Sequence, residues 1–346
     1  MKKIKKVILP ALLITALFSG CTSNKNAATE TAAPAGSETA ASTEAPTSGT
    51  EKSDEASGKI VIGCTLQNLS EEFMTMLKGA MEIKLEEMND ANIELIVNDA
   101  EGKPDKQASQ LDSFVAQKVD AVIISPVDAD ALAPAVKSVV DAGIPVITCS
   151  ADVTGDMGQV WVGSENENGG EIEMQYVAEQ IGGKGKIAIL RGPLGAFAEQ
   201  GRFRGYETVL ANYPDIEVVF DQTANWQREE AMALVENLIT AGTELDAIVC
   251  QNDGMALGAL EAVKAAGKQG EIVVTGIDAI QDALDSVKAG ALNATCFQDA
   301  IGQGMGALEM AVKAANGESI SRNNIPFELV TQENADEYYS RIKLPE

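Results

Sequence analysis

Short β-branched runs alternate with segments of helical periodicity from residue 59 to the end of this chain of 346 residues. In the segment after residue 70, for example, Met74, Leu77 and Met81 recur at the spacing that places them on one face of a helix. Such alternation predicts an α/β fold, in which parallel sheets are covered by helices on both faces. The length favours two domains, because one domain commonly takes about 150 residues. We predict strands at residues 60–64, 93–97, 121–124, 146–148, 160–163, 187–190, 216–220, 247–250, 272–275 and 294–297.

The chain contains no histidine and carries a formal net charge of −26. Without histidine there is no Ser-His-Asp or Cys-His mechanism, and no imidazole to bind a metal or to transfer protons near neutral pH. The acidity also opposes nucleic acid, because binding it requires Lys and Arg to neutralise phosphates. We therefore expect no enzyme of these classes, no nucleic-acid partner, no metal and no cofactor.

The N-terminal residues have the composition of an export signal. Four lysines precede an apolar run that is too short to span a bilayer comfortably. The run ends in Phe18-Ser19-Gly20-Cys21, which resembles a bacterial lipobox; this implies that residues 1–20 are removed and that Cys21 is lipidated. An ordinary signal peptide with a chance cysteine is the alternative. We expect a protein that is exported and anchored by lipid to the outer face of the bacterial cell membrane.

The segment at residues 22–58 differs sharply in composition from residues 59–346. It contains no Val, Ile, Leu, Met or aromatic residue, so it cannot bury enough apolar surface to offset its ordering entropy. We interpret residues 21–58 as the lipidated cysteine and a disordered tether.

Four further cysteines lie far apart in apolar, strand-like runs. No CxxC spacing occurs among them, so a zinc or redox motif is unsupported. Exported proteins can form disulfides, but the apolar settings favour buried, unpaired thiols. These cysteines are Cys64, Cys149, Cys250 and Cys296.

Polar residues follow many of the predicted strands. In open parallel sheets, ligands bind outside the carboxyl ends of the strands, which is where these residues fall. Two examples are Ser150 and the run Gln251-Asn252-Asp253. Neutral hydrogen-bonding groups that converge on one cleft predict a polyhydroxyl ligand.

Some of these polar residues are also typical of helix starts. Ser70, followed by Glu71 and Glu72, predicts an N-cap with acids in the first turn, where the helix dipole favours them. Asp128 and Asp253 each stand just before a predicted helix. We favour helix caps for both, with ligand contact as the alternative.

The run QNDGMALGA at residues 251–259 resembles the type I periplasmic binding proteins, especially their ribose-binding branch. The stretches GIPVITCSAD, ISPVDADAL and VVTGIDA add to the resemblance, which covers residues 59–346. It implies two Rossmann-like lobes that are joined by a hinge of three crossovers and close around one small molecule. Carried over, the N-terminal lobe comprises residues 59–164 plus 298–327. The C-terminal lobe comprises residues 165–297 plus 328–346.

The resemblance also implies an aromatic clamp and an arginine. Phe73 and Trp226 match aromatic residues that pack on the two faces of a sugar from opposite lobes, although each could instead be a core aromatic. Arg202 matches an arginine whose forked donors bind two adjacent hydroxyls.

Other ligand contacts follow from the resemblance in the same way. Asn252 and Asp278 match an amide and a carboxylate of the second lobe, and Gln298 matches a hinge residue that touches ligand. Asn68 lies in the first loop within reach of the ligand. Ser150-Ala151 stands where ribose-binding members carry Asp-Arg or Asn-Arg, which leaves the identity of the sugar open.

Four functions are compatible with parts of this pattern. The resemblance favours a monomeric solute-binding lipoprotein that captures a monosaccharide or related polyol and delivers it to the permease subunits of an ABC importer. The alternative is a sensor that presents its ligand to a chemoreceptor or histidine kinase. A repressor of the related fold would need a DNA-binding helix-turn-helix before residue 59, where this chain has a signal and a tether. A glycosidase needs a pair of carboxylates that nothing in the sequence isolates.

Overall fold

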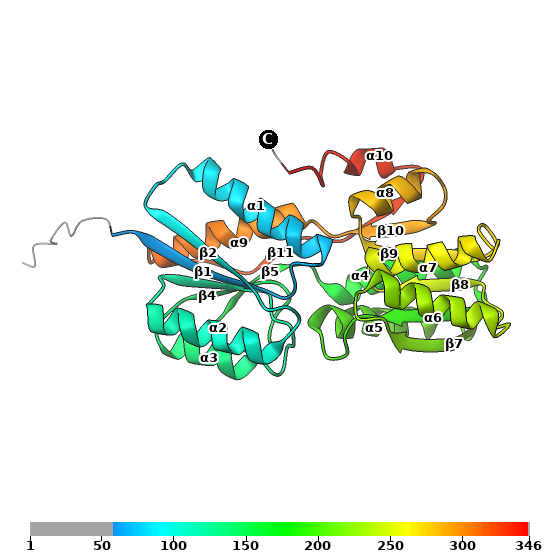
Figure 1. Ribbon diagram of the computed structural model, residues 1–346, viewed down its shortest axis with the longest axis horizontal. Coiled ribbons are helices and arrows are strands. Elements are labelled where there is room, and N and C mark those ends of the chain that lie inside the picture. Colours follow the sequence, from blue (N-terminus) through cyan, green and yellow to red (C-terminus); the bar gives the residue numbers. More distant parts are fainter. Residues whose placement is uncertain (1–57, 345–346) are drawn as a thin grey trace, which may run out of the picture. The chain divides into compact units, whose positions relative to one another are not determined.

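A computed structural model describes residues 58–344, which form two six-stranded sheets flanked by helices (Figure 1). The predicted signal at residues 1–20, Cys21 and all but the last residue of the predicted tether lie outside the described residues. None of the helices in the described part of the chain combines the length and the apolar composition that crossing a bilayer requires.

The first sheet has the strand order β11-β5-β4-β3-β1-β2, and every neighbouring pair is parallel. Helices α2 and α3 pack on one face and α1 and α9 on the other (Figure 1). The strands are β1 (Ile60–Leu66), β2 (Ile93–Asp99), β3 (Ala121–Ile124), β4 (Val146–Ser150), β5 (Val160–Gly163) and β11 (Asn323–Asn324). The helices are α1 (Glu72–Met88), α2 (Pro104–Gln117), α3 (Ala133–Asp141) and α9 (Ala300–Ala315).

The second sheet has the order β12-β10-β9-β8-β6-β7 and is parallel except for the pair β10 and β12. Helices α4 and α5 cover one face, and α6, α7, α8 and α10 cover the other. The strands are β6 (Lys184–Arg191), β7 (Asp215–Thr223), β8 (Ala247–Cys250), β9 (Val273–Asp278), β10 (Ala294–Phe297) and β12 (Glu328–Thr331). The helices are α4 (Asn166–Gln180), α5 (Phe197–Leu210), α6 (Arg228–Thr240), α7 (Asp253–Ala265), α8 (Gln281–Lys288) and α10 (Ala335–Tyr338).

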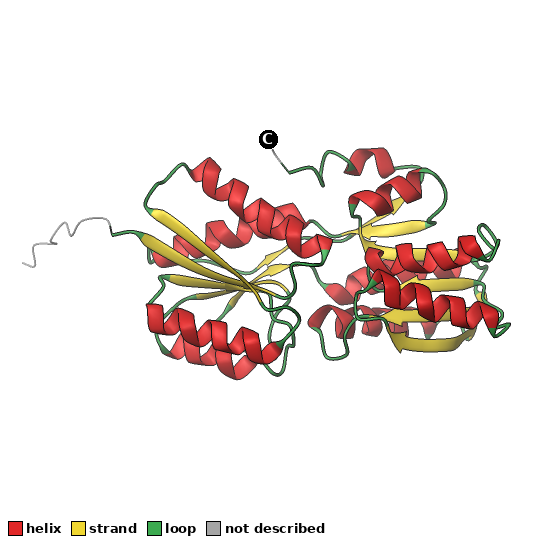
Figure 2. Ribbon diagram, viewed as in Figure 1, coloured by secondary structure: helices red, strands yellow, loops and turns green. Residues whose placement is uncertain are grey.

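The α/β fold predicted from the alternation is confirmed, and all ten predicted strands are present (Figure 2). Two strands were not predicted. β11 has two residues, and β12 is a short edge strand after a loop, so neither has the run of β-branched residues that marks the central strands. The four internal cysteines are buried and unpaired, which confirms the prediction from their apolar sequence neighbours.

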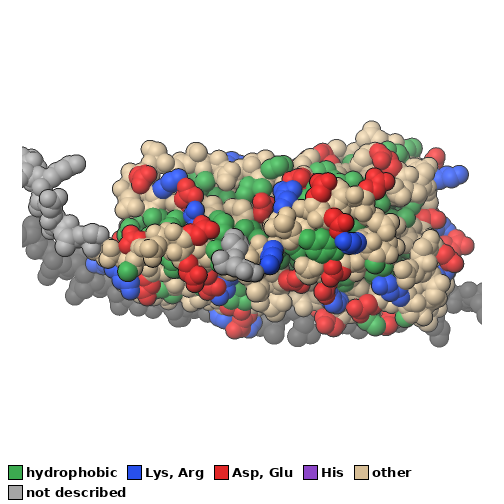
Figure 3. Space-filling model, turned by 90° about the horizontal axis from the view of Figure 1, so that it is seen from above, with side chains coloured by type: hydrophobic (Ala, Val, Ile, Leu, Met, Phe, Trp, Pro, Cys, Tyr) green, Lys and Arg blue, Asp and Glu red, His purple; other side chains and the backbone are tan. Residues whose placement is uncertain are grey.

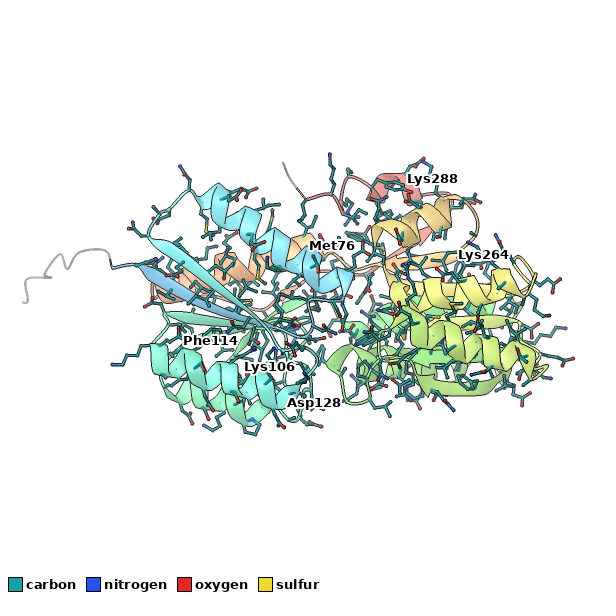
Figure 4. The ribbon with its side chains drawn as sticks, in the orientation of Figure 1. Met76, Lys106, Phe114, Asp128, Lys264 and Lys288 are labelled. Atoms are coloured by element: carbon teal, nitrogen blue, oxygen red, sulfur yellow. The ribbon has the colours of Figure 1, made fainter. Side chains whose placement is uncertain are left out.

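The chain passes between the two sheets at three points. They lie between β5 and α4, between β10 and α9, and between β11 and β12. The last described residues return to the first sheet's helices, where the side chain of Leu344 packs on Gly79 of α1. Met76 of α1, labelled in Figure 4, packs against the cores of both sheets. We call each sheet with its helices one half of the molecule. The two halves therefore touch through side chains as well as through the crossing segments.

Acidic and basic side chains mix over the surface seen in Figure 3. Many of them form exposed pairs, such as Lys78 with Glu82 and Lys137 with Asp141. Pairs of this kind contribute little to stability because water and salt screen them. The large negative charge is thus carried mostly by a solvated surface.

Helices α4 and α5 cross at unusually short range because glycines face each other's backbone. A Cβ on Gly170 would overlap the carbonyl group of Arg202, and one on Gly205 would overlap the carbonyl oxygen of Glu167. This close approach sets the height of α5 above the sheet, and with it the position of Arg202. In contrast, a Cβ on Gly306 of α9 would make only ordinary contacts, at 3.5 Å from Val162 Cγ1.

We expect Gly170→Ala and Gly306→Ala to change stability in opposite directions. Gly170→Ala forces two backbones apart and should lower the free energy of unfolding by about 1–3 kcal/mol. Gly306→Ala removes a flexible residue from a helix and should raise it by up to about 1 kcal/mol. Urea unfolding followed by circular dichroism measures both, and equal effects of the two variants would contradict the close-crossing interpretation.

Candidate functional site

A cavity of about 450 Å³ lies where the carboxyl ends of strands from both sheets meet. Its wall combines residues of α1 and the end of β4 with residues of α5, α6, α7, α8 and the end of β9. This is the place at which the strand-end rule puts a ligand in open parallel sheets. The lining residues are Gln67, Ser70, Glu71, Glu72, Phe73, Met74, Ser150, Ala151, Ala198, Arg202, Trp226, Gln227, Arg228, Glu229, Asn252, Gly254, Asp278, Ile280, Asp282 and Gln298.

The structure brings seven of the eight predicted ligand residues to this cavity. The exception is Asn68, which does not line it. The Asn68 side-chain oxygen accepts hydrogen bonds from the backbone N–H and the hydroxyl of Ser70, at 3.1 and 2.8 Å. Asn68 therefore shapes the turn that leads into α1. The seven that line the cavity are Phe73, Ser150, Arg202, Trp226, Asn252, Asp278 and Gln298.

Arg202 is the buried cation of the site. Its Nε donates to Asn166 Oδ1 at 3.2 Å, one terminal nitrogen donates to the backbone carbonyl of Gln251, and the other donates to Gln298 Oε1 at 2.6 Å. The guanidinium carbon lies 5.7 Å from the centre of the Trp226 ring. Since three of its five N–H groups are held in this way, the planar group is fixed before any ligand arrives.

Gln298 connects the two sheets at the cavity. It directly follows β10 of the second sheet, and its Nε2 donates to the hydroxyl of Ser150, at the end of β4 in the first sheet, at 3.4 Å. Its other side-chain atom accepts from Arg202. A hydrogen-bonded path thus runs from the first sheet to Arg202 through one hinge residue.

Asp278 ends β9 and is buried, with 7% of its surface exposed. Within the described residues no group donates a hydrogen bond to its carboxylate, and its nearest cation is Arg202, with 3.7 Å between Oδ1 and Nη2. Burial raises the pKa of Asp278 well above its usual range. Asp253, Glu71 and Glu72 raise it further, while Arg202 opposes the shift. The carboxylate therefore faces the cavity with hydrogen-bonding capacity that the protein does not use.

The backbone is strained beside these side chains. Asp278 and Ala279 have φ of 132° and 58°, Trp226 has φ of 62°, and Ser150 has φ of 65°. Non-glycine residues rarely adopt positive φ, and those that do cluster where the surrounding structure holds a functional side chain in place. Three of these four residues line the cavity.

Phe73 and Trp226 reach the cavity from different halves. Phe73 lies in the first turn of α1 and also packs in the core of the first sheet. Trp226 packs against the core of the second sheet and lies over the backbone of Gly192 at the end of β6. The sequence left open whether each residue is a core aromatic or a ligand contact. In the structure each ring packs against a core and also lines the cavity.

Asn252 caps α7, and Asp253 does not. The Asn252 side-chain oxygen accepts from the N–H of Met255 at 2.9 Å. The cap predicted at Asp253 is wrong, since this residue is fully buried and accepts from the Thr295 hydroxyl at 2.7 Å and from the N–H of Ile280 at 3.0 Å. It binds the loop after β9 from behind the cavity. Asp128 accepts from the N–H groups of Asp130 and Ala131, in a turn before α3.

The start of α1 also differs from its prediction. The cap position is Glu71, while the hydroxyl of Ser70 donates to Asn68. Glu71 and Glu72 line the cavity, a role that the sequence did not reveal because acids at a helix start have an ordinary electrostatic explanation. Burial raises the pKa of Glu71 to about 7.

The other half contributes charged residues that were also not predicted. Arg228 and Glu229 begin α6, and Asp282 lies in the first turn of α8. Arg228 donates to Asp282 across 3.1 Å, and both lie on the cavity wall. Their sequence neighbours carry no pattern of a site, so only the tertiary structure, which brings the start of α6 to the start of α8, identifies them.

Residues 62–319 match the model of the periplasmic binding protein domain. The chain belongs to the periplasmic binding protein family. This confirms the family that the run at residues 251–259 indicated. Its members are exported proteins that bind solutes and are not enzymes. In residues 58–344, no cluster of three or more Cys, Asp and Glu residues is arranged to hold a metal ion.

Three similar proteins are informative. A xylitol-binding protein of Mycolicibacterium smegmatis is 39% identical over 282 residues, which are 80% of this chain and 78% of that protein. The ribose import binding protein of Bacillus subtilis is 32% identical, over 79% of this chain and 88% of that protein. A crystal structure of an ABC transporter solute-binding protein from Bacillus halodurans with bound myo-inositol is 41% identical, with a TM-score of 0.80, and covers 83% of this chain and 99% of that chain.

A buried network of hydrogen bonds lies behind the cavity and joins α4, α5 and β9 of the second half. Glu173 of α4 accepts from the hydroxyls of Tyr206 and Thr275, the latter at 2.8 Å. Burial raises the pKa of Glu173 to about 7, against the effect of these two hydrogen bonds. Burial also raises the pKa of Asp253 to about 7. Both groups bind a proton more tightly in the folded chain than in the unfolded one.

We expect stability to fall as the pH rises from about 4.5 to 7, because the folded chain holds protons there that the unfolded chain has released. A group such as Glu173 contributes at most about 1.4 kcal/mol for each pH unit. Glu173→Gln should flatten the decline, and Glu179→Gln on the exposed side of the same helix should not. Urea unfolding at pH 5, 6, 7 and 8 measures this; an equally steep decline in Glu173→Gln would contradict it.

Proposed function

We propose that this protein captures one monosaccharide or related polyol in the cavity and delivers it to the permease of an ABC importer. The observation that carries the proposal is the cavity wall, where two aromatic rings from different halves accompany fixed hydrogen-bonding groups. The three similar proteins bind xylitol, ribose and myo-inositol, according to their names, and two of these names refer to import or to an ABC transporter. These relatives favour import over the sensor alternative.

The residues divide the task by chemistry. The C–H faces of a ligand ring pack on the faces of Phe73 and Trp226, and this buries apolar surface without needing hydrogen bonds. The two free N–H groups of Arg202 and the unbonded carboxylate of Asp278 offer a donor and an acceptor to neighbouring hydroxyls. Asn252, Ser150 and Gln298 add neutral groups around them.

Closure of the two halves is the step that the importer would recognise. The hydrogen bond of Gln298 to Ser150 and the packing of Met76 against both cores join the two halves in this structure. Ligand that touches both halves shifts the population toward this closed form. We place the lobe boundaries at 59–164 plus 298–327 and at 165–297 plus 328–346.

We further propose that the chain is exported as a monomer and held at the outer face of the membrane by lipid on Cys21. Residues 1–20 would be the cleaved signal and residues 21–58 the lipidated cysteine and tether. The support is the lysine-rich start, the short apolar run and the Phe-Ser-Gly-Cys ending. Anchoring keeps a binding protein near its permease when no outer barrier retains it.

Isothermal titration against pentoses, hexoses, inositols and linear polyols tests the binding function. We expect saturable binding of at least one compound with a stoichiometry of one per chain. Binding of an amino acid or peptide, with no binding across the sugar and polyol panel, would overturn the proposal.

Trp226→Ala should weaken binding of the best ligand at least tenfold. The substitution removes one face of the clamp and a ring beside Arg202, and loss of a buried stacking contact costs on the order of 1–3 kcal/mol. Titration calorimetry measures the affinity. The matched control is Trp161→Phe, which changes the other tryptophan outside the cavity lining and should retain binding. Unchanged affinity in Trp226→Ala would contradict the clamp.

Cys21→Ser should release the protein from the membrane. A serine cannot accept the thioether-linked lipid, and an unmodified chain has no other anchor of comparable strength in this proposal. Membrane and soluble fractions of the native host, probed together with mass spectrometry of the N-terminal peptide, measure the outcome. A Cys21→Ser protein that still carries lipid would refute the assignment.

A further inference from the structure

Acidic groups outnumber basic groups on the cavity wall. Five carboxylates line it, against two guanidinium groups. The acids are Glu71, Glu72, Glu229, Asp278 and Asp282, and the bases are Arg202 and Arg228.

Both arginines are already engaged. Arg228 forms an ion pair with Asp282, and Arg202 gives three hydrogen bonds to protein groups and lies 3.7 Å from Asp278. Within residues 58–344, no Lys or Arg side chain forms an ion pair with Glu71. Its side chain interacts with the amide of Asn68, which is neutral. The wall thus holds more acidic than basic groups, and Glu71 can ionise there only without a counter-charge from the protein.

Two carboxylates on opposite walls matter most. Asp278 is buried without a hydrogen bond, and it belongs to the second sheet, whereas Glu71 stands at the start of α1 beside the first sheet. Their charges repel each other, since Glu71 and Glu72 both raise the pKa of Asp278. A neutral polyol could satisfy the hydrogen-bonding capacity of both groups, but it would not help both of them to ionise. A cation would, because it favours the charged form of each carboxyl group.

We propose that the preferred ligand is an aminated polyol, a ring or chain of hydroxyl groups that carries one protonated amine placed against Glu71. An ammonium group offers three donors and a positive charge, so it compensates the carboxylate on the first wall while the hydroxyls occupy the second wall. This inference rests on the proposed function, because it places the ligand in the same cavity. It makes Glu71 the residue that determines specificity, and it excludes anionic ligands such as sugar phosphates.

Matched pairs of ligands test the proposal at pH 7.0 with the full-length mature chain. Each pair has one ring and differs in one substituent: inositol against an aminodeoxyinositol, glucose against glucosamine, and galactose against galactosamine. Titration calorimetry should show that the amino member of at least one pair binds tenfold or more tightly than its hydroxyl parent. If the hydroxyl parent binds as tightly or more tightly in every pair that binds, the inference is overturned and the polyol-binding function still holds. If neither these pairs nor any compound of the wider sugar and polyol panel binds, the proposed function itself has failed.

A variant pair assigns the preference to Glu71. Glu71→Gln keeps the size and the hydrogen-bonding oxygen but removes the charge, so the ratio of the two affinities should fall toward one. Glu86→Gln is the control, because Glu86 is an exposed glutamate at the other end of the same helix. It should retain the wild-type ratio. A ratio that survives in Glu71→Gln would refute the role of this residue, whichever ligand binds.

Discussion

The buried guanidinium of Arg202 is the interaction on which the rest of this site depends. It joins α4 through Asn166, the end of β8 through the carbonyl of Gln251, and the hinge through Gln298. A buried charge needs such partners, because removing it from water is costly unless hydrogen bonds and a counter-charge replace the lost solvation. The glycine crossing of α4 and α5 sets its height, and the strained strand ends bring Asp278 and Trp226 to its side.

The same arrangement leaves hydrogen-bonding groups open to a ligand. Arg202 keeps two N–H groups without protein partners, and Asp278 keeps a carboxylate without hydrogen bonds. Both groups line the cavity, so a ligand with hydroxyl groups can form hydrogen bonds with them that the protein itself does not provide. Under the proposed function, binding and closure are coupled, because a ligand that contacts groups of both halves favours the closed form.

Much of the fold could be predicted because its signals are local. Central parallel strands are buried on both faces, so runs such as residues 121–124 and 247–250 are uniformly apolar and stand out. The edge strands β11 and β12 were missed because short edge strands need no such run. Seven of the eight predicted ligand residues line the cavity. Most of these predictions came from the family resemblance, because a single polar residue after a strand can equally cap a helix or form a turn.

The sequence by itself determined the alternation of strands and helices, the export signal expected at the N-terminus, the exclusion of histidine chemistry and the family. Each of these depends on composition or on neighbours along the chain. Only the tertiary structure decided that Asn252 rather than Asp253 caps α7, that Asn68 shapes a turn, and that Glu71, Glu72 and Arg228 line the cavity. The reason is physical: a carboxylate at a helix start looks the same along the chain whether it faces water or a cavity. Which of the two it faces depends on segments far away in the sequence, such as the end of β9, which lines the same cavity as Glu71.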